Sequence, residues 1–158
     1  MVSLNPIDPK DFDVFMNQAI DVYTQDNIKS GTWQPDEALE KSREEFHRLL
    51  PEGLKTKDQY LFTILDNNSN NKIGVLWVQV KINTSPRKAF ICDFIIEPQF
   101  RGQGYGKQVL QALDEKLIQM NVESVSLHVF AHNTNAVGLY KTVGYLPTNL
   151  YMKKTLVG

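Results

Sequence analysis

The stretch from Glu97 to Gln108 reads EPQFRGQGYGKQ and stands between two apolar runs. The preceding residues, KAFICDFII, are typical of a buried strand, whereas the apolar residues after the glycines recur every three or four positions, as in a helix. A strand that enters a glycine-rich turn and then a helix directs backbone N–H groups and the positive end of the helix dipole at one point. The stretch therefore predicts a loop that binds an anionic group, phosphate above all.

Two common phosphate-binding loops do not fit this stretch. A nucleoside triphosphate loop needs Gly-Lys followed by Ser or Thr for magnesium, but Gly106 and Lys107 are followed by Gln108. A dinucleotide-binding loop needs G-x-G-x-x-G and an acidic residue that ends the next strand, whereas these glycines alternate and Glu123 precedes its strand. A plain turn between strand and helix stays open as an alternative.

The chain on either side of the loop predicts a mixed α/β domain. Asp8 with Pro9 and Pro35 with Asp36 are typical helix starts, and an Asn, Asp and Ser cluster joins two β-rich runs as a hairpin. The strand before the glycines should be parallel to the strand after their helix, because a helix connects the two. The expected order is a strand at 2–7, two helices, strands within 59–82 and at 88–98, a helix after the glycines, a strand at 123–130, a helix at 133–144 and a last strand at 150–156.

Composition limits the classes of protein that the chain can be. With 158 residues, 42% of them hydrophobic, we expect one domain over residues 1–158. A net charge of -1 gives no general attraction to nucleic acid or to a membrane surface, and the apolar runs are too short to span a bilayer. The single cysteine, Cys92, and a start without the regions of a signal peptide favour a cytoplasmic protein.

A second motif lies thirty residues after the glycines, in LHVFAHNTNAVGLYKTVGY. Together with Arg101-x-x-Gly104-x-Gly106, it resembles the two signatures of the GNAT superfamily of N-acyltransferases. In the second signature, Asn begins a helix, Ala follows three residues later, Leu-Tyr comes one turn on, and Gly with an aromatic residue ends the helix. The matching residues are Asn133, Ala136, Leu139, Tyr140, Gly144 and Tyr145.

The resemblance covers residues 60–156 well and the first third by the order of its elements. The sequence segments SGTW, LLPEGL and SLHVFAHN are most similar to segments of YycN-type bacterial acetyltransferases. The family fold is an α/β domain with a mixed central sheet, whose two central parallel strands splay apart, flanked by about four helices. The resemblance implies acetyl-CoA as co-substrate.

The resemblance also assigns the residues that bind CoA. Backbone N–H groups of the glycine loop would hold the pyrophosphate, and main-chain groups of the preceding strand would pair with pantetheine as with an added strand. The residues concerned are Phe94, Ile95 and Ile96 in the strand, Arg101, Gly102, Gln103, Gly104, Tyr105, Gly106 and Lys107 in the loop, and Asn133 and Tyr140 in the last helix.

Tyr140, His128 and Asp93 are the candidate catalytic residues. Tyr140 has the family role of general acid toward the CoA thiolate, with packing in the core as the alternative. His128 stands where the similar ribosomal-protein alanine acetyltransferases carry a glutamate base, and could be the base or a hydrogen-bonded strand residue. Asp93, a charge in an apolar strand, could orient His128, bind the substrate ammonium, act as base or be a partly solvated carboxylate. Asn133 could cap its helix, contact CoA, or both.

Cys92 and His132 are not predicted to take part in catalysis or metal binding. Strand alternation places Asp93 on one face with Ile91 and Ile95, and Cys92 on the other face. His132 is assigned to a loop, and the spacing of His128 and His132 across a strand end predicts no metal site.

The acceptor pocket should come from the first two helices and their connection, with Tyr23, Trp33 and Gln34 as candidates.

The sequence thus predicts an enzyme that moves an acetyl group from acetyl-CoA directly to a primary amine. The acceptor could be a protein N-terminus, a lysine or a small-molecule amine. The alternative is an acyl-CoA-binding sensor or interaction module with little turnover. Neither a nucleic-acid nor a membrane partner is expected, and a homodimer formed through the exposed edge of the last strand stays open.

Overall fold

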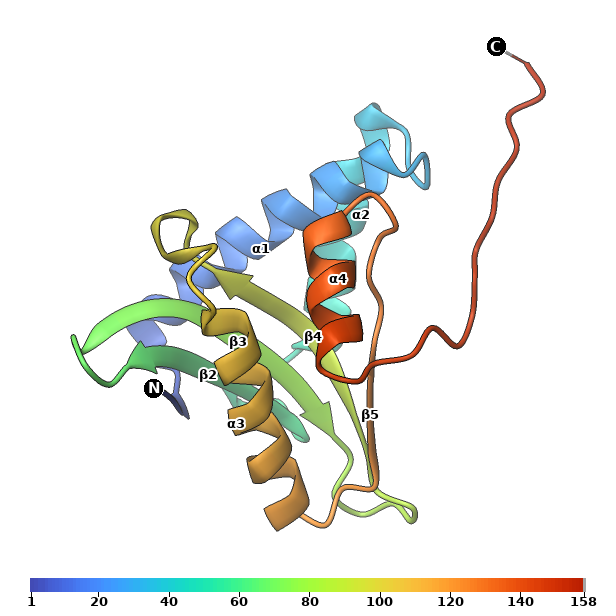
Figure 1. Cartoon of the computed structure of the whole chain (residues 1–158). Helices are drawn as coiled ribbons and strands as arrows, with labels where there is room; N and C mark the ends of the chain where they lie inside the picture. Colours follow the sequence, from blue (N-terminus) through green and yellow to red (C-terminus); the bar gives the residue numbers. More distant parts are fainter. Residues whose placement is uncertain (158) are drawn as a thin grey trace.

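Five strands form one sheet in the computed structural model, which describes residues 1–157 (Figure 1). Neighbouring strands are antiparallel from β1 to β4, and β4 and β5 are parallel. α3 lies between β4 and β5 in the chain, as the predicted parallel pair requires. The strands, in spatial order, are β1 (Val2–Pro6), β2 (Gln59–Asp66), β3 (Asn71–Val80), β4 (Lys88–Ile96) and β5 (Ser124–Leu127).

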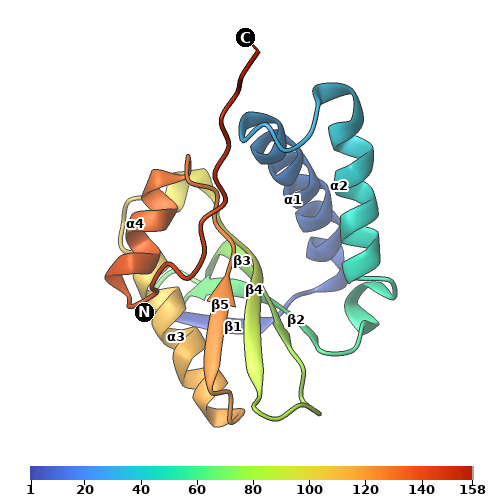
Figure 2. The same cartoon turned by 90° about the vertical axis from the view of Figure 1, so that its right-hand side faces the viewer.

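Helices cover both faces of the sheet (Figure 2), which confirms the predicted mixed α/β fold. α1 (Pro9–Lys29) and α2 (Pro35–Leu49) lie on one face, and α3 (Tyr105–Gln119) and α4 (Thr134–Thr142) lie on the other. The predicted starts are correct: the Asp8 carboxylate accepts from the Lys10 N–H at 2.8 Å, and Glu37 accepts from the Gln34 N–H at 3.2 Å.

Each face of the sheet has its own core. On the α3 face, buried residues of the central strands pack against one apolar stripe of α3, formed by Val109, Leu110, Leu113 and Leu117. On the α1 and α2 face, Phe15 and Phe46 pack with Trp77 and Ile95. Apolar positions repeating at helical spacing produce these stripes, so the sequence pattern accounts for the layers.

A β-bulge interrupts the pairing of β3 with β4. Trp77 lies opposite Asp93 and Val78 lies opposite Ile91, so Cys92 is the extra residue. Directly opposed residues point to the same face, and Trp77 belongs to the core under α1 and α2. Asp93 therefore faces α1 and α2 together with Cys92, while Ile91 packs under α3. The predicted alternation was wrong at Ile91 and Cys92 because it assumed an unbroken strand.

The last strand expected at 150–156 is absent from the described residues, and β5 is shorter than expected. Residues 146–157 form neither helix nor strand, and each of them is exposed. This C-terminal segment runs away from the domain as an extended chain (Figures 1 and 2). The expected strand does not form because a strand needs a partner for its backbone, and residues 1–157 provide none for this segment.

Candidate active site

The two parallel strands, β4 and β5, separate partway along their length. β4 pairs with β5 from Lys88 to Ile91, and Leu127 is the last partner, but β4 continues to Ile96. The second half of β4 is thus paired with β3 alone. This is the predicted splay of the central strands.

Backbone groups of β4 at Phe94 and Ile96 lie on the opened edge. The Phe94 N–H donates to the Asp93 carboxyl at 2.8 Å, and the Ile96 carbonyl accepts from Arg101 Nε at 2.7 Å, so both are held by side chains rather than by β3. Alternation along a strand directs the backbone groups of Ile95 toward β3 instead. Of the three predicted pantetheine-binding residues, Phe94 and Ile96 therefore present hydrogen-bonding groups to the opening.

The glycine loop leads from the opened end of β4 into α3. Gly104 is the N-cap of α3 with a φ of 83°, and Gly102 has a φ of 74°, a conformation that favours glycine at both positions. A glycine N-cap has no side chain to accept from the first N–H groups of the helix. Those N–H groups, from Tyr105 onward, are available to an anion at the positive end of the helix dipole.

The surface in front of the loop is open. Among the described residues, no atom lies within 4 Å of where a Cβ at Gly102 or Gly104 would stand. A Cβ there would occupy the space in which a phosphate could meet the backbone. By contrast, a Cβ at Gly106 would come within 2.7 Å of Leu139 on α4, so this glycine allows two helices to pack closely.

The flanking side chains of the loop have distinct partners. Arg101 and Lys107 are exposed and add positive charge beside the helix start. The Tyr105 hydroxyl donates to Asp66 at 3.1 Å, and the Gln103 amide donates to the Gln99 carbonyl at 3.0 Å. Tyr105 and Gln103 can therefore offer their backbone N–H groups to a ligand while their side chains hold the loop.

Asp93 is an unusual carboxyl group, placed at the opening between β4 and β5. Burial raises its pKa to about 7, the hydrogen bond from Phe94 lowers it by less, and the nearby negative charge of Asp26 raises it further. At neutral pH the group exchanges readily between its protonated and ionised forms. Such a carboxyl can accept a proton from a bound amine. Burial also raises the pKa of the neighbouring Cys92 thiol to about 12, so that thiol stays protonated.

Tyr140 and Asn133 lie on α4, two turns apart. Burial and then the charge of Asp93 raise the pKa of Tyr140, which keeps the phenol protonated and able to donate. Its ring packs edge-on against Tyr145, 5.5 Å between centroids, so packing and donation are compatible. Asn133 is the N-cap of α4, but within the described chain its carboxamide makes no capping hydrogen bond and is free for another partner.

A row of aromatic rings follows the end of β5. The rings of His128 and Phe130 lie 4.9 Å apart, and those of Phe130 and His132 stack at 5.5 Å. Phe130 also meets Tyr23 of α1, so the row lies on the same face of the sheet as Asp93. His128 itself is exposed, and no hydrogen bond links it to Asp93 among the described residues.

His132 and Asp26 were missed by the sequence analysis. His132 Nε2 lies 2.9 Å from the Asp26 carboxylate of α1, and each side chain is about four-fifths buried. Asp26 is also close enough to Asp93 to affect its pKa. The pair joins residues 106 positions apart in the chain, and no local pattern marks it.

The predicted acceptor side is built from aromatic residues. The ring of Tyr23 packs edge-on against Trp33 at 5.6 Å and against Phe46 at 5.7 Å. Gln34 is exposed at the start of α2. Tyr23 of α1 and Trp33 of the connection between α1 and α2 are thus brought together, and their role in an acceptor pocket stays a prediction.

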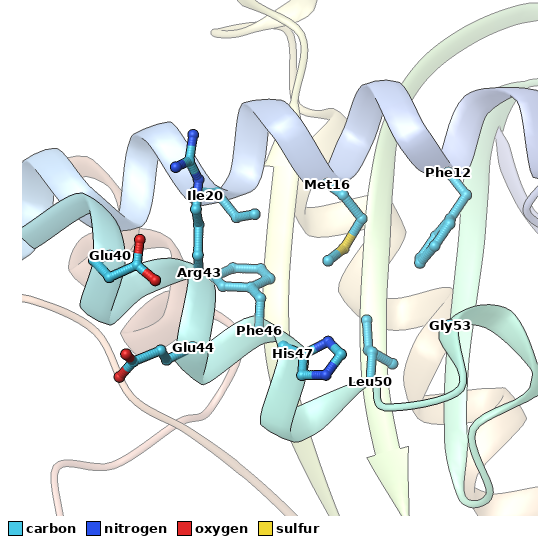
Figure 3. Close-up of a pocket in the computed structure, with 10 residues that line it drawn as sticks. All are labelled: Phe12, Met16, Ile20, Glu40, Arg43, Glu44, Phe46, His47, Leu50 and Gly53. Atoms are coloured by element: carbon cyan, nitrogen blue, oxygen red, sulfur yellow. The ribbon is translucent and has the colours of Figure 1, made fainter.

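A separate groove lies between α1 and α2 (Figure 3). Phe12, Met16 and Ile20 of α1 face Phe46 and Leu50 across it, and charged side chains of α2 stand at its rim. All the residues that line it lie between positions 12 and 53. The groove is therefore distinct from the opening beside the glycine loop.

Two further features of residues 1–157 bear on the site. They contain no group of three or more His, Cys, Asp or Glu side chains arranged to hold a metal ion. None of their helices has both the length and the apolar character needed to span a bilayer.

A parallel strand pair that opens beside a glycine loop suits a long ligand with a phosphate group, laid along the free edge of β4. The chain belongs to the acetyltransferase (GNAT) family, whose sequence model matches residues 19–145. It is therefore an acetyl-CoA-dependent N-acetyltransferase, as the two motifs predicted.

Two relatives from Bacillus subtilis match almost the whole chain. The uncharacterized N-acetyltransferase YycN is 36% identical over 98% of this chain and 99% of its own. The uncharacterized N-acetyltransferase YdgE is 35% identical, with 98% of each chain covered. The similarity to YycN-type acetyltransferases predicted from the sequence is confirmed.

The crystal structure of YycN superposes with a TM-score of 0.95 over 100% of both chains. The spermidine N-acetyltransferase of Vibrio cholerae, in complex with CoA and spermine, has the same fold, with a TM-score of 0.63 and 23% identity over 99% of this chain and 88% of its own.

Proposed function

We propose that this enzyme transfers the acetyl group of acetyl-CoA directly to a primary amine, without a covalent enzyme intermediate. One observation carries the proposal. The free edge of β4 runs from Asp93, with Tyr140 nearby, to the glycine loop, so a single path joins two proton-handling groups to an anion-binding helix start.

The chain would hold CoA at two places. Backbone N–H groups from Gly102 to Lys107 would bind the pyrophosphate, and Arg101 would add positive charge. The Phe94 N–H and the Ile96 carbonyl would pair with the pantetheine amides, after exchange of their present side-chain partners. Acetyl-CoA supplies the activated acyl group, and the protein supplies its position.

Asp93 is our candidate for the general base. The amine nitrogen must lose a proton to attack the thioester carbonyl, and a carboxylate with a pKa of about 7 can accept that proton directly or through water. As the new C–N bond forms, the C–S bond breaks, and the Tyr140 hydroxyl donates its proton to the departing sulfur. The nitrogen then loses its second proton, which restores the Tyr140 phenol directly or through water, and Asp93 releases the first proton to solvent. His128 is exposed, and we assign it no proton transfer in this scheme.

We further propose a cationic acceptor. Asp26 and Asp93 lie within electrostatic range of one another, and within residues 1–157 Asp26 alone of the two has a side-chain partner on another element, His132. An ammonium group would relieve their repulsion, and the rings of Tyr23 and Trp33 would pack against its carbon chain. Lysine side chains, polyamines and protein N-termini all fit this description. The spermidine acetyltransferase from V. cholerae is a relative with a substrate of this kind.

The domain organisation and the cellular compartment of the enzyme are part of the proposal. We propose that residues 1–158 act as one domain in the cytoplasm. The shared sheet with a core on each face and the use of acetyl-CoA support this.

An acceptor screen tests the proposal. The protein is mixed with acetyl-CoA and a panel of N-terminal peptides, lysine, polyamines and amino sugars, and free thiol and product mass are followed. We expect thiol release and an added acetyl group with at least one cationic amine, and loss of both in Asp93→Asn. CoA binding without thiol release above the protein-free control would support the alternative, an acyl-CoA-binding module.

A further inference from the structure

The segment that follows β5, residues 128–133, continues along the opening without a partner in the sheet. Pairing of β5 with β4 ends at Leu127 and Ile91, and residues 128–133 belong to no strand or helix. A backbone hydrogen bond from the Asn133 N–H to the Phe130 carbonyl, at 3.0 Å, stays within the segment. The place of this segment in the fold therefore depends on its side chains.

α1 supplies side-chain contacts to the segment. The ring of Phe130 meets the ring of Tyr23, with 6.5 Å between their centroids. His132 Nε2 lies 2.9 Å from the Asp26 carboxylate. Tyr23 and Asp26 are three residues apart, so they lie on one side of the helix. One side of α1 thus contacts alternate residues of the unpaired segment.

Asp26 is a carboxylate on the buried side of α1. Phe15 and Ala19 precede it at helical spacing in the core under α1 and α2. Only 22% of the Asp26 side chain and 20% of the His132 side chain are exposed. A carboxylate in such a place needs a hydrogen-bond partner. Because a carboxylate only accepts, His132 Nε2 carries the hydrogen.

The contact of Asp26 with His132 connects the two sides of the opening. α1 packs on the core beside β3 and β4. His132 directly precedes the N-cap of α4, the helix that carries Tyr140. Asp93 faces the same side of the sheet and is near enough for the charge of Asp26 to raise its pKa. The contact is therefore close to the groups that handle protons, although neither of its members belongs to them.

We propose that Asp26 and His132 are a positioning pair for the acetyl transfer. Their hydrogen bond holds the segment after β5 against α1 and thereby fixes the acceptor side of the opening between β4 and β5. Neither residue transfers a proton or touches CoA in this scheme. The inference rests on the proposed function in one respect, because it requires the amine to enter on the α1 face. The pair should therefore affect how the amine is bound and leave the binding of CoA unchanged.

Two replacements of His132 separate its hydrogen bond from its ring. Glutamine can place an N–H group where Nε2 stands and donate to Asp26, but it has no ring to stack on Phe130. Phenylalanine keeps the stack, in which the ring centroids are 5.5 Å apart, and cannot donate. His132→Gln is thus the matched control of His132→Phe.

Steady-state kinetics with acetyl-CoA use spermidine, lysine and an unacetylated N-terminal peptide as amines. In His132→Phe, kcat/KM for each amine that reacts should fall about ten- to a hundredfold, as expected when a bound reactant is misplaced, while CoA affinity by calorimetry stays within about twofold. In His132→Gln, kcat/KM should return to within about threefold of the wild-type value, because the hydrogen bond is kept.

A double-mutant cycle tests whether the effect comes from this contact. Asp26→Ala removes the acceptor of the hydrogen bond, so in that background His132→Phe should change kcat/KM by less than about twofold. Urea unfolding of the same four proteins measures the coupling without any acetyl transfer, and we expect the two replacements to be non-additive. Asp21→Ala, at an exposed position of α1, is the control for Asp26→Ala and should leave the effect of His132→Phe unchanged.

Three results would overturn the positioning pair. Additive effects on unfolding would show that the contact does not form in solution. A loss of CoA affinity in His132→Phe as large as the loss of kcat/KM would make the contact a general support of the fold. Equal kcat/KM in His132→Gln and His132→Phe would show that the hydrogen bond does not position the amine.

The proposed function fails in a different way. Thiol release with none of the amines would contradict it, together with the positioning role that rests on it. The unfolding measurements would then still report whether Asp26 and His132 are coupled.

Discussion

Replacement of Asp93 by Asn should stabilise the protein at neutral and alkaline pH while it removes activity. Asn has the size of Asp but no charge to bury. In the folded wild type the pKa of Asp93 is about 7, mainly because of burial, whereas an Asp in an unfolded chain titrates near 3.8. Ionisation therefore favours the unfolded chain throughout the interval between the two values.

The magnitude follows from that difference in pKa. Each unit corresponds to about 1.4 kcal/mol, so the wild type should lose up to about 4 kcal/mol of folding stability as the pH rises from about 4 to about 7. Above pH 7 the folded form is ionised as well, and the loss levels off. The side chain is partly exposed, so solvent should reduce the full value. Asp93→Asn should show none of this loss.

Urea unfolding of wild type and Asp93→Asn at pH 5, 6, 7 and 8 measures the effect. We expect the free energies of unfolding to diverge as the pH rises, with Asp93→Asn the more stable at pH 8. Asp21→Asn, which replaces an exposed carboxylate on α1, is the matched control and should follow the wild type. Equal pH dependence in wild type and Asp93→Asn would refute the perturbed pKa of Asp93.

Three further changes test the other parts of the site. Gly104→Ala should reduce CoA affinity, measured by calorimetry, at least about tenfold, because a Cβ would stand where phosphate meets the backbone. The control is Gly144→Ala, at a similarly positive φ of 105°, which should cost about 1 kcal/mol of stability and leave CoA affinity unchanged. Equal losses of affinity in the two variants would make the loop a plain turn. Tyr140→Phe should lower kcat about ten- to a hundredfold at nearly constant CoA affinity, and the reverse pattern would make Tyr140 a binding residue. His128→Gln should leave the rise of kcat/KM through about pH 7 in place if Asp93 is the base, and a displaced rise would assign that role to His128.

The sequence predicted the features of this fold that depend on neighbouring residues. Helix starts at Pro9 and Pro35 follow from local capping, and the glycine loop follows from the conformations that Gly102 and Gly104 must adopt. The parallel arrangement of β4 and β5 follows from the helix between them. In each of these cases, the deciding interactions span only a few residues or one connection.

The features that were missed depend on contacts between distant parts of the chain. The contact of Asp26 with His132 forms because the end of α1 meets the segment after β5, and neither residue has a local signal. The C-terminal segment has strand composition, but composition does not state whether a partner edge is within its reach. Both errors concern tertiary context rather than local preference.

The bulge at Cys92 reconciles two demands on one strand. Ala89 and Ile91 must point under α3 to complete that core, while Asp93 and Ile95 must point toward α1 and α2. In an unbroken strand all four would share one face, because their positions are all odd. If that face lay under α3, the Asp93 carboxyl would enter an apolar core. If it lay under α1 and α2, Ile91 would leave its core at a cost of about 2 kcal/mol. One extra residue shifts the alternation between Ile91 and Asp93, so the fold keeps its core and still turns a carboxyl toward the opening.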